Sequence, residues 1–222
     1  MNADRIGVFL PCLEPGPIEA QLGAAAELGV RYVQPALFPD VAPSPAEWAK
    51  LKAEAERNGL VVSAVSAYQD YANPDGLEAR IAKLKACLDL ASELPNPVAI
   101  TESGGVPFAE GEQRDREWRV LVDSMKEAAD YAGKVGAYIA MEPGGSGLVA
   151  SVESMRALLD EVNHPHMKLN LDPANITMFG SDAVRAAREL GPHVIHAHAK
   201  DGVFYYRLTQ REFAGIAGRI TS

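Results

Sequence analysis

Three side chains that could bind a metal ion follow three successive apolar segments of the sequence. Glu142 ends "AYIAME", Asp172 ends "KLNLD", and His198 lies within "VIHAHAKDG". Two carboxylates and one imidazole form a mixed oxygen and nitrogen ligand set that suits Mn²⁺, Mg²⁺, Co²⁺ or Zn²⁺. If the three segments are neighbouring strands whose carboxyl ends meet, we expect these side chains to converge.

Each of these residues, taken alone, also has an ordinary structural interpretation. Glu142 before Pro143 fits a solvated loop acid, and Asp172 before Pro173 fits a helix cap or a turn. His198 fits a buried core histidine. What favours a site is that all three lie at the same height on adjacent predicted strands.

The last of these segments alternates in a way that is typical of a β-strand. Alternate side chains of a strand share one face. The face predicted to line the site contains Val194, His196, His198 and Lys200, and the opposite face contains Ile195, Ala197 and Ala199. His196 then lies one layer deeper than His198, where it packs beside the site or supports a ligand.

Strand-like runs alternate with helical patterns along the whole chain, with seven strands and at least six helices. The strand segments are predicted within residues 5–13, 31–38, 61–68, 97–105, 137–145, 168–175 and 193–202. Ser44 is predicted to cap the helix after the second strand, and Gly59 to end it. This alternation predicts a parallel sheet covered by helices.

No glycine-rich phosphate turn follows the first strand, which disfavours an open nucleotide-binding sheet. We therefore predict one α/β domain over residues 1–222, a (β/α) TIM-type barrel that is incomplete, with about seven parallel strands. Active sites of such barrels lie at the carboxyl ends of the strands, where Glu142, Asp172 and His198 are predicted.

Composition narrows the function classes. The chain has 222 residues, 47% of them hydrophobic, and a formal net charge of −9, which disfavours a nucleic-acid partner. No apolar run is long enough to cross a membrane, and no signal peptide is visible, so a cytoplasmic protein is expected. Cys12 and Cys87 lack the spacing of a zinc site and are expected to be small core residues.

Five segments together resemble a known family. "AYIAMEPGG", "KLNLDPAN" and "HVIHAHAKDG" look like the fifth, sixth and seventh strands of the sugar phosphate isomerase/epimerase family with the xylose isomerase-like TIM barrel. "GVRYVQPALF" and "VVSAVSAY" resemble its second and third strands, so the resemblance extends over most of the chain.

The resemblance implies a site and a reaction. Divalent-metal ligands would be Glu142, Asp172 and His198, and substrate-lining residues would include Asn175, Lys200 and Asp201. The substrate would be a small sugar or sugar phosphate. Its proton next to a carbonyl would be removed to give an enediolate, with Glu142 as one of the acid–base groups.

Two further substrate-lining candidates come from their places on the strands. His196 lies on the face of His198, and Glu102 lies near the end of the fourth strand, where a solvated loop acid is the alternative. Glu102 also begins the run "ESGG", whose backbone amides could cradle a phosphate or simply form a turn.

The sequence departs from the family in two places. The family's fourth metal ligand is a glutamate on an eighth strand, but Glu212 is the only acid after Asp201. Gln34 also occupies a position on the second strand where relatives commonly have an acid. A second hypothesis is therefore a catalytically incomplete barrel, truncated or completed by another chain, that at most binds metal or sugar.

An open barrel would expose strand edges, which predicts a homo-oligomer. A third hypothesis is a DNA repair enzyme similar to the apurinic endonucleases, which resemble this barrel. Those enzymes add metal-binding histidines on other strands, and "PALF", "VSAY" and "TESG" contain none. We rank this hypothesis last.

Overall fold

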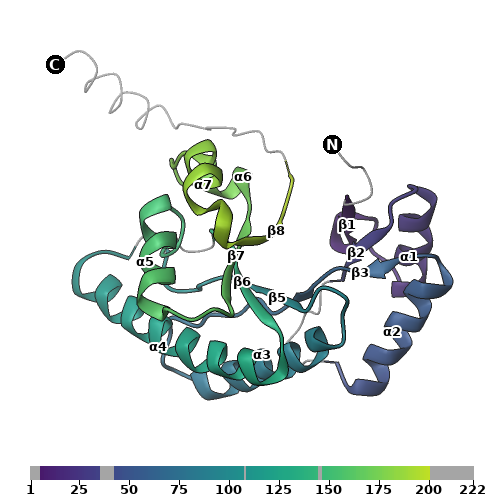
Figure 1. Cartoon of the computed structure of the whole chain (residues 1–222), viewed down its shortest axis with the longest axis horizontal. Coiled ribbons are helices and arrows are strands. Elements are labelled where there is room, and N and C mark those ends of the chain that lie inside the picture. Colours follow the sequence, from purple (N-terminus) through teal and green to yellow (C-terminus); the bar gives the residue numbers. More distant parts are fainter. Residues whose placement is uncertain (1–5, 36–42, 108, 145–146, 201–222) are drawn as a thin grey trace, which may run out of the picture.

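The computed structural model describes residues 6–35, 43–107, 109–144 and 147–200. Within them, strands alternate with helices in chain order, as predicted (Figure 1). The strands are β1 (Gly7–Phe9), β2 (Tyr32–Gln34), β3 (Val61–Val62), β4 (Val65–Ser66), β5 (Val98–Thr101), β6 (Tyr138–Met141), β7 (Met167–Leu171) and β8 (Val194–Ala197). The α-helices are α1 (Ile18–Glu27), α2 (Pro45–Arg57), α3 (Leu77–Ser92), α4 (Gly111–Val135), α5 (Val152–Val162), α6 (Pro173–Met178) and α7 (Ala183–Leu190). Two short 3-10 helices are η2 (Leu10–Cys12) and η3 (Gly191–His193).

All strand pairs are parallel and form two sheets, with the orders β1-β2-β3 and β4-β5-β6-β7-β8. Residues 61–68 were predicted as one strand but contain both β3 and β4. β3 pairs with β2, and β4 pairs with β5, because the two neighbours overlap this extended segment over different residues. The seven predicted strands therefore appear as eight elements.

The wall of the barrel is not closed. The strand order begins at β1 and ends at β8, and no backbone ladder joins these two strands among the described residues. The helices lie on the outer side of the curved row of strands (Figure 1). This is the α/β barrel architecture that the sequence predicts, with one gap in the wall.

Apolar residues pack on both faces of the strands. A large outer cluster lies between the strands and the helices, and a small inner cluster contains Ala64, Val98, Ile100 and Ala140. Every residue of β5 is buried, as expected for a parallel strand covered on both faces. Strand alternation continues the inner face from Ala140 to Glu142, so polar side chains follow the apolar layer at the carboxyl ends.

The predicted helix signals of α2 are confirmed. Ser44 Oγ accepts a hydrogen bond from the backbone N–H of Glu47, and the Glu47 carboxylate accepts one from the backbone N–H of Ser44, which forms a complete capping box. Gly59 follows the helix with φ +70°, a conformation that glycine adopts without strain.

The register of β8 shifts by one residue against β7, which corrects the predicted faces. Leu169 pairs with Val194, but Asn170 pairs with His196, which leaves Ile195 as an extra residue. Val194 therefore packs against the outer cluster and Ile195 against the inner one, the reverse of the simple alternation. Strand alternation alone could not predict this bulge.

Two expectations from composition have different outcomes. Cys87 is buried as predicted, but Cys12 is exposed, so the prediction of a core residue was wrong there. The reason is that η2 is a single turn, in which Leu10 faces the core and Cys12, at the other end, faces solvent. No helix in the described part of the chain is long and apolar enough to span a membrane.

Candidate metal centre

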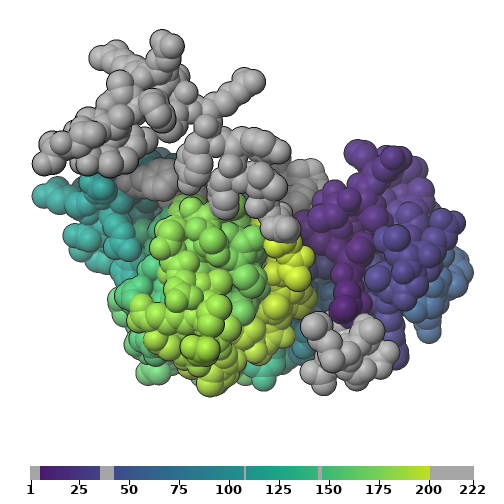
Figure 2. All heavy atoms as spheres, turned by 90° about the horizontal axis from the view of Figure 1, so that it is seen from above, coloured from purple at the N-terminus to yellow at the C-terminus, as the bar shows by residue number. Residues whose placement is uncertain are grey.

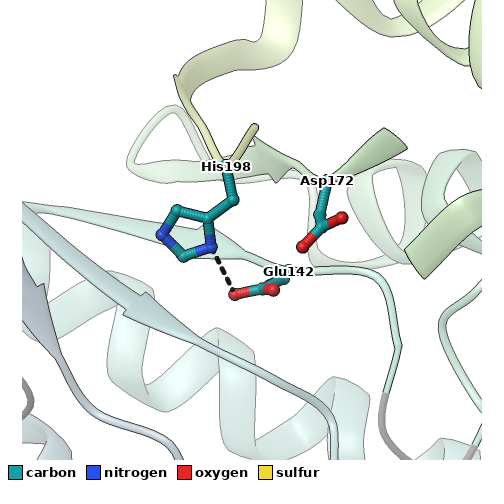
Figure 3. Close-up of side chains that lie close together, drawn as sticks. All are labelled: Glu142, Asp172 and His198. Atoms are coloured by element: carbon teal, nitrogen blue, oxygen red, sulfur yellow. Dashed lines mark ion pairs between the residues drawn. The ribbon is translucent and has the colours of Figure 1, made fainter. Parts of the chain in front are cut away.

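Glu142, Asp172 and His198 converge at the carboxyl ends of three neighbouring strands (Figure 3). They directly follow β6, β7 and β8. One ligand atom from each lies within 4.8 Å of the others. Both acidic residues are buried, with exposed fractions of 7% for Glu142 and 0% for Asp172.

The carboxylate of Glu142 is held by donors on several elements. Its Oε2 accepts a short hydrogen bond from Tyr68 and one from Asn170 Nδ2 at 3.1 Å, and Oε1 accepts one from Asn175 Nδ2 at 3.1 Å. Burial favours the neutral acid, but the hydrogen bond and charge of His198 in its protonated form, with the Tyr68 hydroxyl, hold the pKa of Glu142 below its ordinary value.

Tyr68 is a permanent donor in this arrangement. Burial, with the negative charge of Glu142, raises the pKa of Tyr68 above its ordinary range. Its hydroxyl therefore stays protonated and donates a hydrogen bond to the carboxylate of Glu142.

Asp172 begins α6 and has one oxygen with an unusual environment. Its Oδ1 accepts the backbone N–H of Asn175 at 2.9 Å and caps the helix. From the residues that the structure describes, its fully buried Oδ2 accepts no hydrogen bond of good geometry, although Nζ of Lys200 lies 2.9 Å away. Lys200 therefore places a positive charge beside Oδ2 but donates no well-aligned hydrogen bond to it.

Asn170 connects the site to the deeper histidine. Its Nδ2 lies 3.1 Å from Glu142 Oε2 and 3.0 Å from His198 Nδ1, and its Oδ1 lies 3.0 Å from His196 Nδ1. Burial and the neighbouring His198 lower the pKa of His196 to about 4. His196 is thus a neutral ring that supports the site from below.

The other side of His198 faces the three-stranded sheet. Its Nε2 lies 2.8 Å from Gln34 Oε1, and its ring stacks on Phe9 with a centroid distance of 5.8 Å. From above, the yellow residues of the β8 region lie beside the purple N-terminal residues (Figure 2). Side chains therefore bridge the two ends of the strand row where backbone pairing does not.

The remaining predicted site residues fall into three groups. Asn175 and Lys200 contact the carboxylates directly. Glu102 is half-buried near the end of β5, where burial and the charge of Glu142 raise its pKa. Asp201, like Glu212, lies outside the described residues.

The "ESGG" run has a structural partner. The backbone N–H of Gly105 donates to Asp70 Oδ1 at 2.8 Å, and a Cβ on Gly104 would collide with Asp70. These contacts favour the interpretation as a turn over that as a phosphate cradle, because this amide is already used.

The side chains present fit a divalent cation. Two buried carboxylates and an imidazole supply the oxygen and nitrogen ligands that such ions take. A buried anionic oxygen without a directed donor, Asp172 Oδ2, is an atom that a cation would satisfy.

Sequence reasoning missed two residues of the surroundings. Alternation placed Asn170 on the face of Asp172 but did not reveal that it joins both histidines to Glu142. For Gln34, the sequence showed only that an amide stands where relatives commonly have an acid. Its contact with His198 spans 164 positions, so no local pattern encodes it.

The fold and the site together define a parallel α/β barrel with a cluster of potential metal ligands at the carboxyl ends of its strands. The chain belongs to the xylose isomerase-like TIM barrel family, whose sequence pattern it matches over residues 22–214. The family resemblance found in the sequence is confirmed.

Among curated proteins, 3-dehydroshikimate dehydratase of Bacillus anthracis is 27% identical over 142 residues. The matched region covers 64% of this chain and 50% of the dehydratase. The chain thus matches half the length of that relative.

Solved structures share the fold. The 3-keto-D-glucoside 4-epimerase of E. coli superposes with a TM-score of 0.77 at 14% identity, covering 96% of this chain and 87% of the epimerase. The D-psicose 3-epimerase of Clostridium cellulolyticum H10, with D-tagatose, gives 0.72 at 18% identity and covers 97% and 82%. Both are named as epimerases of sugars.

Proposed function

We propose that this chain is a divalent-metal-dependent isomerase or epimerase of a small sugar or sugar phosphate. The observation that supports it most is the convergence of Glu142, Asp172 and His198 within 4.8 Å at the carboxyl ends of neighbouring strands. The names of similar folds, which include sugar epimerases, agree with this class.

In this proposal, Glu142, Asp172 and His198 hold Mn²⁺, Mg²⁺, Co²⁺ or Zn²⁺. A bound cation of this kind supplies a Lewis acid that polarises a substrate carbonyl. Lys200 and Asn175, which contact the two carboxylates, lie where they can also bind substrate hydroxyls.

Glu142 is the proposed acid–base group. Its lowered pKa leaves it ionised at neutral pH, ready to accept a proton from the carbon beside the carbonyl. The electron pair of that C–H bond moves to the carbonyl oxygen and gives an enediolate. Return of a proton to the opposite face is epimerisation, and return to the neighbouring carbon is isomerisation.

A second candidate is a dehydratase of a hydroxylated ketone. It is favoured by the match to 3-dehydroshikimate dehydratase. The first step would be the same proton abstraction, after which a hydroxyl leaves as water instead of a proton returning. Product analysis with 3-dehydroshikimate and with a panel of ketoses separates the two reactions.

A third candidate is a barrel that binds metal or sugar without turnover and is completed by a second copy. The open wall between β1 and β8 favours it. A monomer in light scattering at micromolar concentration would contradict completion by another copy.

The test of the proposed function is metal content and turnover of purified protein after Mn²⁺ supplementation. We expect one equivalent of metal and conversion of at least one ketose. Glu142→Gln, Asp172→Asn and His198→Gln should each lose both. Matched controls are Asp182→Asn, which removes a charge but keeps an oxygen that can cap α7, and His193→Gln on the exposed η3. A wild type without metal would contradict the proposal.

A further inference from the structure

Both ring nitrogens of His198 have polar neighbours, and the neighbours of the two nitrogens differ in kind. Nε2 lies 2.8 Å from Oε1 of Gln34. Nδ1 lies 3.0 Å from Nδ2 of Asn170 and 3.1 Å from Oε2 of Glu142. A neutral imidazole has one N–H, so the partners decide which nitrogen keeps a free lone pair.

On the Gln34 side, a chain of hydrogen bonds fixes the orientation of the amide. Ser66 Oγ lies 3.2 Å from the carbonyl oxygen of Pro35, which only accepts, so the hydroxyl donates there. Ser66 then accepts from Gln34 Nε2 at 3.0 Å. Because the amide nitrogen faces Ser66, its oxygen faces His198, and Nε2 of the imidazole must be the donor.

The Asn170 side gives the same answer independently. The carboxylate of Glu142 only accepts, so Asn170 presents its NH₂ group to it. The same NH₂ group faces His198 Nδ1, which must then be an acceptor. The oxygen of Asn170 is left to accept from Nδ1 of His196 at 3.0 Å. Glu142 Oε2, 3.1 Å from the same Nδ1, is also an acceptor, so in the neutral ring two lone pairs face one position that a cation would fill. With Nε2 as a donor, only the doubly protonated ring could also donate from Nδ1 to Glu142.

We infer that Gln34 is a positioning residue that holds His198 as the Nε2–H tautomer, so that Nδ1 is the nitrogen presented to a divalent cation beside Glu142 and Asp172. The cation in this inference rests on the proposed function, whereas the tautomer is a property of the chain itself. Metal-binding histidines in general depend on the partner of their second nitrogen for orientation.

An amide suits this position better than the acid expected from relatives. Gln34 is 3% exposed, and Glu142 and Asp172 already place two buried carboxylates nearby. A third would add negative charge without charge balance. The amide accepts from His198 with its oxygen and donates to Ser66 with its nitrogen, so it meets both neighbours without adding a charge.

The first test is nitrogen NMR of histidine-labelled, metal-free full-length protein at a pH where the imidazole is neutral. His198 is assigned by the loss of its signals in His198→Gln. We expect a protonated Nε2 and an unprotonated Nδ1. A proton on Nδ1 would overturn the inference, and this result does not depend on whether metal binds.

The second test compares Gln34→Met with Gln34→Glu by Mn²⁺ titration. Methionine has a similar length but accepts no strong hydrogen bond, so we expect affinity to fall by about 10- to 100-fold and the tautomer preference to weaken. Glutamate can still accept from Nε2–H, with Ser66 turned to donate to it, and should keep the tautomer and affinity within about three-fold of wild type.

Ser63→Ala is the matched control, because Ser63 donates to Val33 on the same strand segment but does not reach His198. It should bind Mn²⁺ as wild type does. Circular dichroism establishes that each variant is folded. Gln34→Met with unchanged tautomer and affinity would overturn the role of Gln34. A wild type that shows the Nε2–H tautomer but binds no Mn²⁺ would instead overturn the cation and the proposed function.

Discussion

The two sheets of the barrel differ in how they are built and in what they contribute to the site. In the five-stranded sheet, β4 has two residues and the other strands have four or five, whereas β1, β2 and β3 have two or three. β5 is buried throughout, whereas the two edge strands, β1 and β8, are half-buried to exposed. The middle of the five-stranded sheet is therefore the best-packed part of the described barrel.

This difference separates two tasks. All three candidate ligands follow strands of the five-stranded sheet. The three-stranded sheet adds no candidate ligand, but Gln34 bonds to His198, and Phe9 at the end of β1 stacks on its ring. One half therefore supplies the charges, and the other orients the imidazole.

The largest effect is expected from a cavity in the five-stranded half. Leu169→Ala removes a fully buried side chain of β7 and should lower the free energy of unfolding by about 2–5 kcal/mol. Leu13→Ala removes a partly buried side chain near β1 and should lower it by less than about 2 kcal/mol. Urea unfolding measures both. Equal losses would show that the two halves are packed equally well.

Acid should affect the site through Glu142. Its pKa is lowered in the folded protein, so its ionised form stabilises the fold above the usual glutamate range and this contribution is lost as the pH falls through the folded pKa. The stability of metal-free wild type relative to Glu142→Gln should therefore decrease on acidification below about pH 4.3.

Glu102 provides a control of opposite sign. Its pKa is raised, so its ionised form disfavours the fold. The stability of wild type relative to Glu102→Gln should increase as the pH falls, in the same urea titrations. Parallel curves for the two variants would contradict the assignment of these environments.

A smaller effect is expected from Lys200. Its ammonium group pairs with Asp172 Oδ2, and its side chain is 49% exposed, so the pair is worth at most about 1 kcal/mol. A cation must compete with it, and Lys200→Met should tighten Mn²⁺ binding by up to about five-fold. Lys50→Met, which breaks an exposed pair with Glu19, should leave binding unchanged. Weaker binding in Lys200→Met would instead make Lys200 part of the cation site.

The smallest effect concerns the two thiols, one in each half. Cys12 in η2 is exposed, whereas Cys87 in α3 is buried, and this burial raises the pKa of its thiol to about 11. Mass spectrometry after thiol labelling should show one modification in the native protein and a second only in denaturant. Rapid double labelling under native conditions would mean that the five-stranded half opens easily.

The sequence predicted the order of strands and helices because hydrophobic periodicity and caps such as Ser44 are local signals. It also predicted the meeting of Glu142, Asp172 and His198, since strand ends in a parallel barrel lie at one rim. That these residues bind metal stays a prediction.

Three features could not be predicted because they depend on pairing between distant segments. The shift at Ile195 arises from the register of β8 against β7. The division of residues 61–68 arises from their two neighbours. The partners of Gln34 depend on the closing of the barrel wall by side chains from opposite ends of the chain.

The most direct test of the site is anomalous diffraction from crystals of the full chain soaked in Mn²⁺. We expect one strong peak within about 2.5 Å of carboxylate oxygens of Glu142 and Asp172 and of Nδ1 of His198. A peak bound elsewhere, or a site in which these three side chains contact no ion at saturating Mn²⁺, would contradict it.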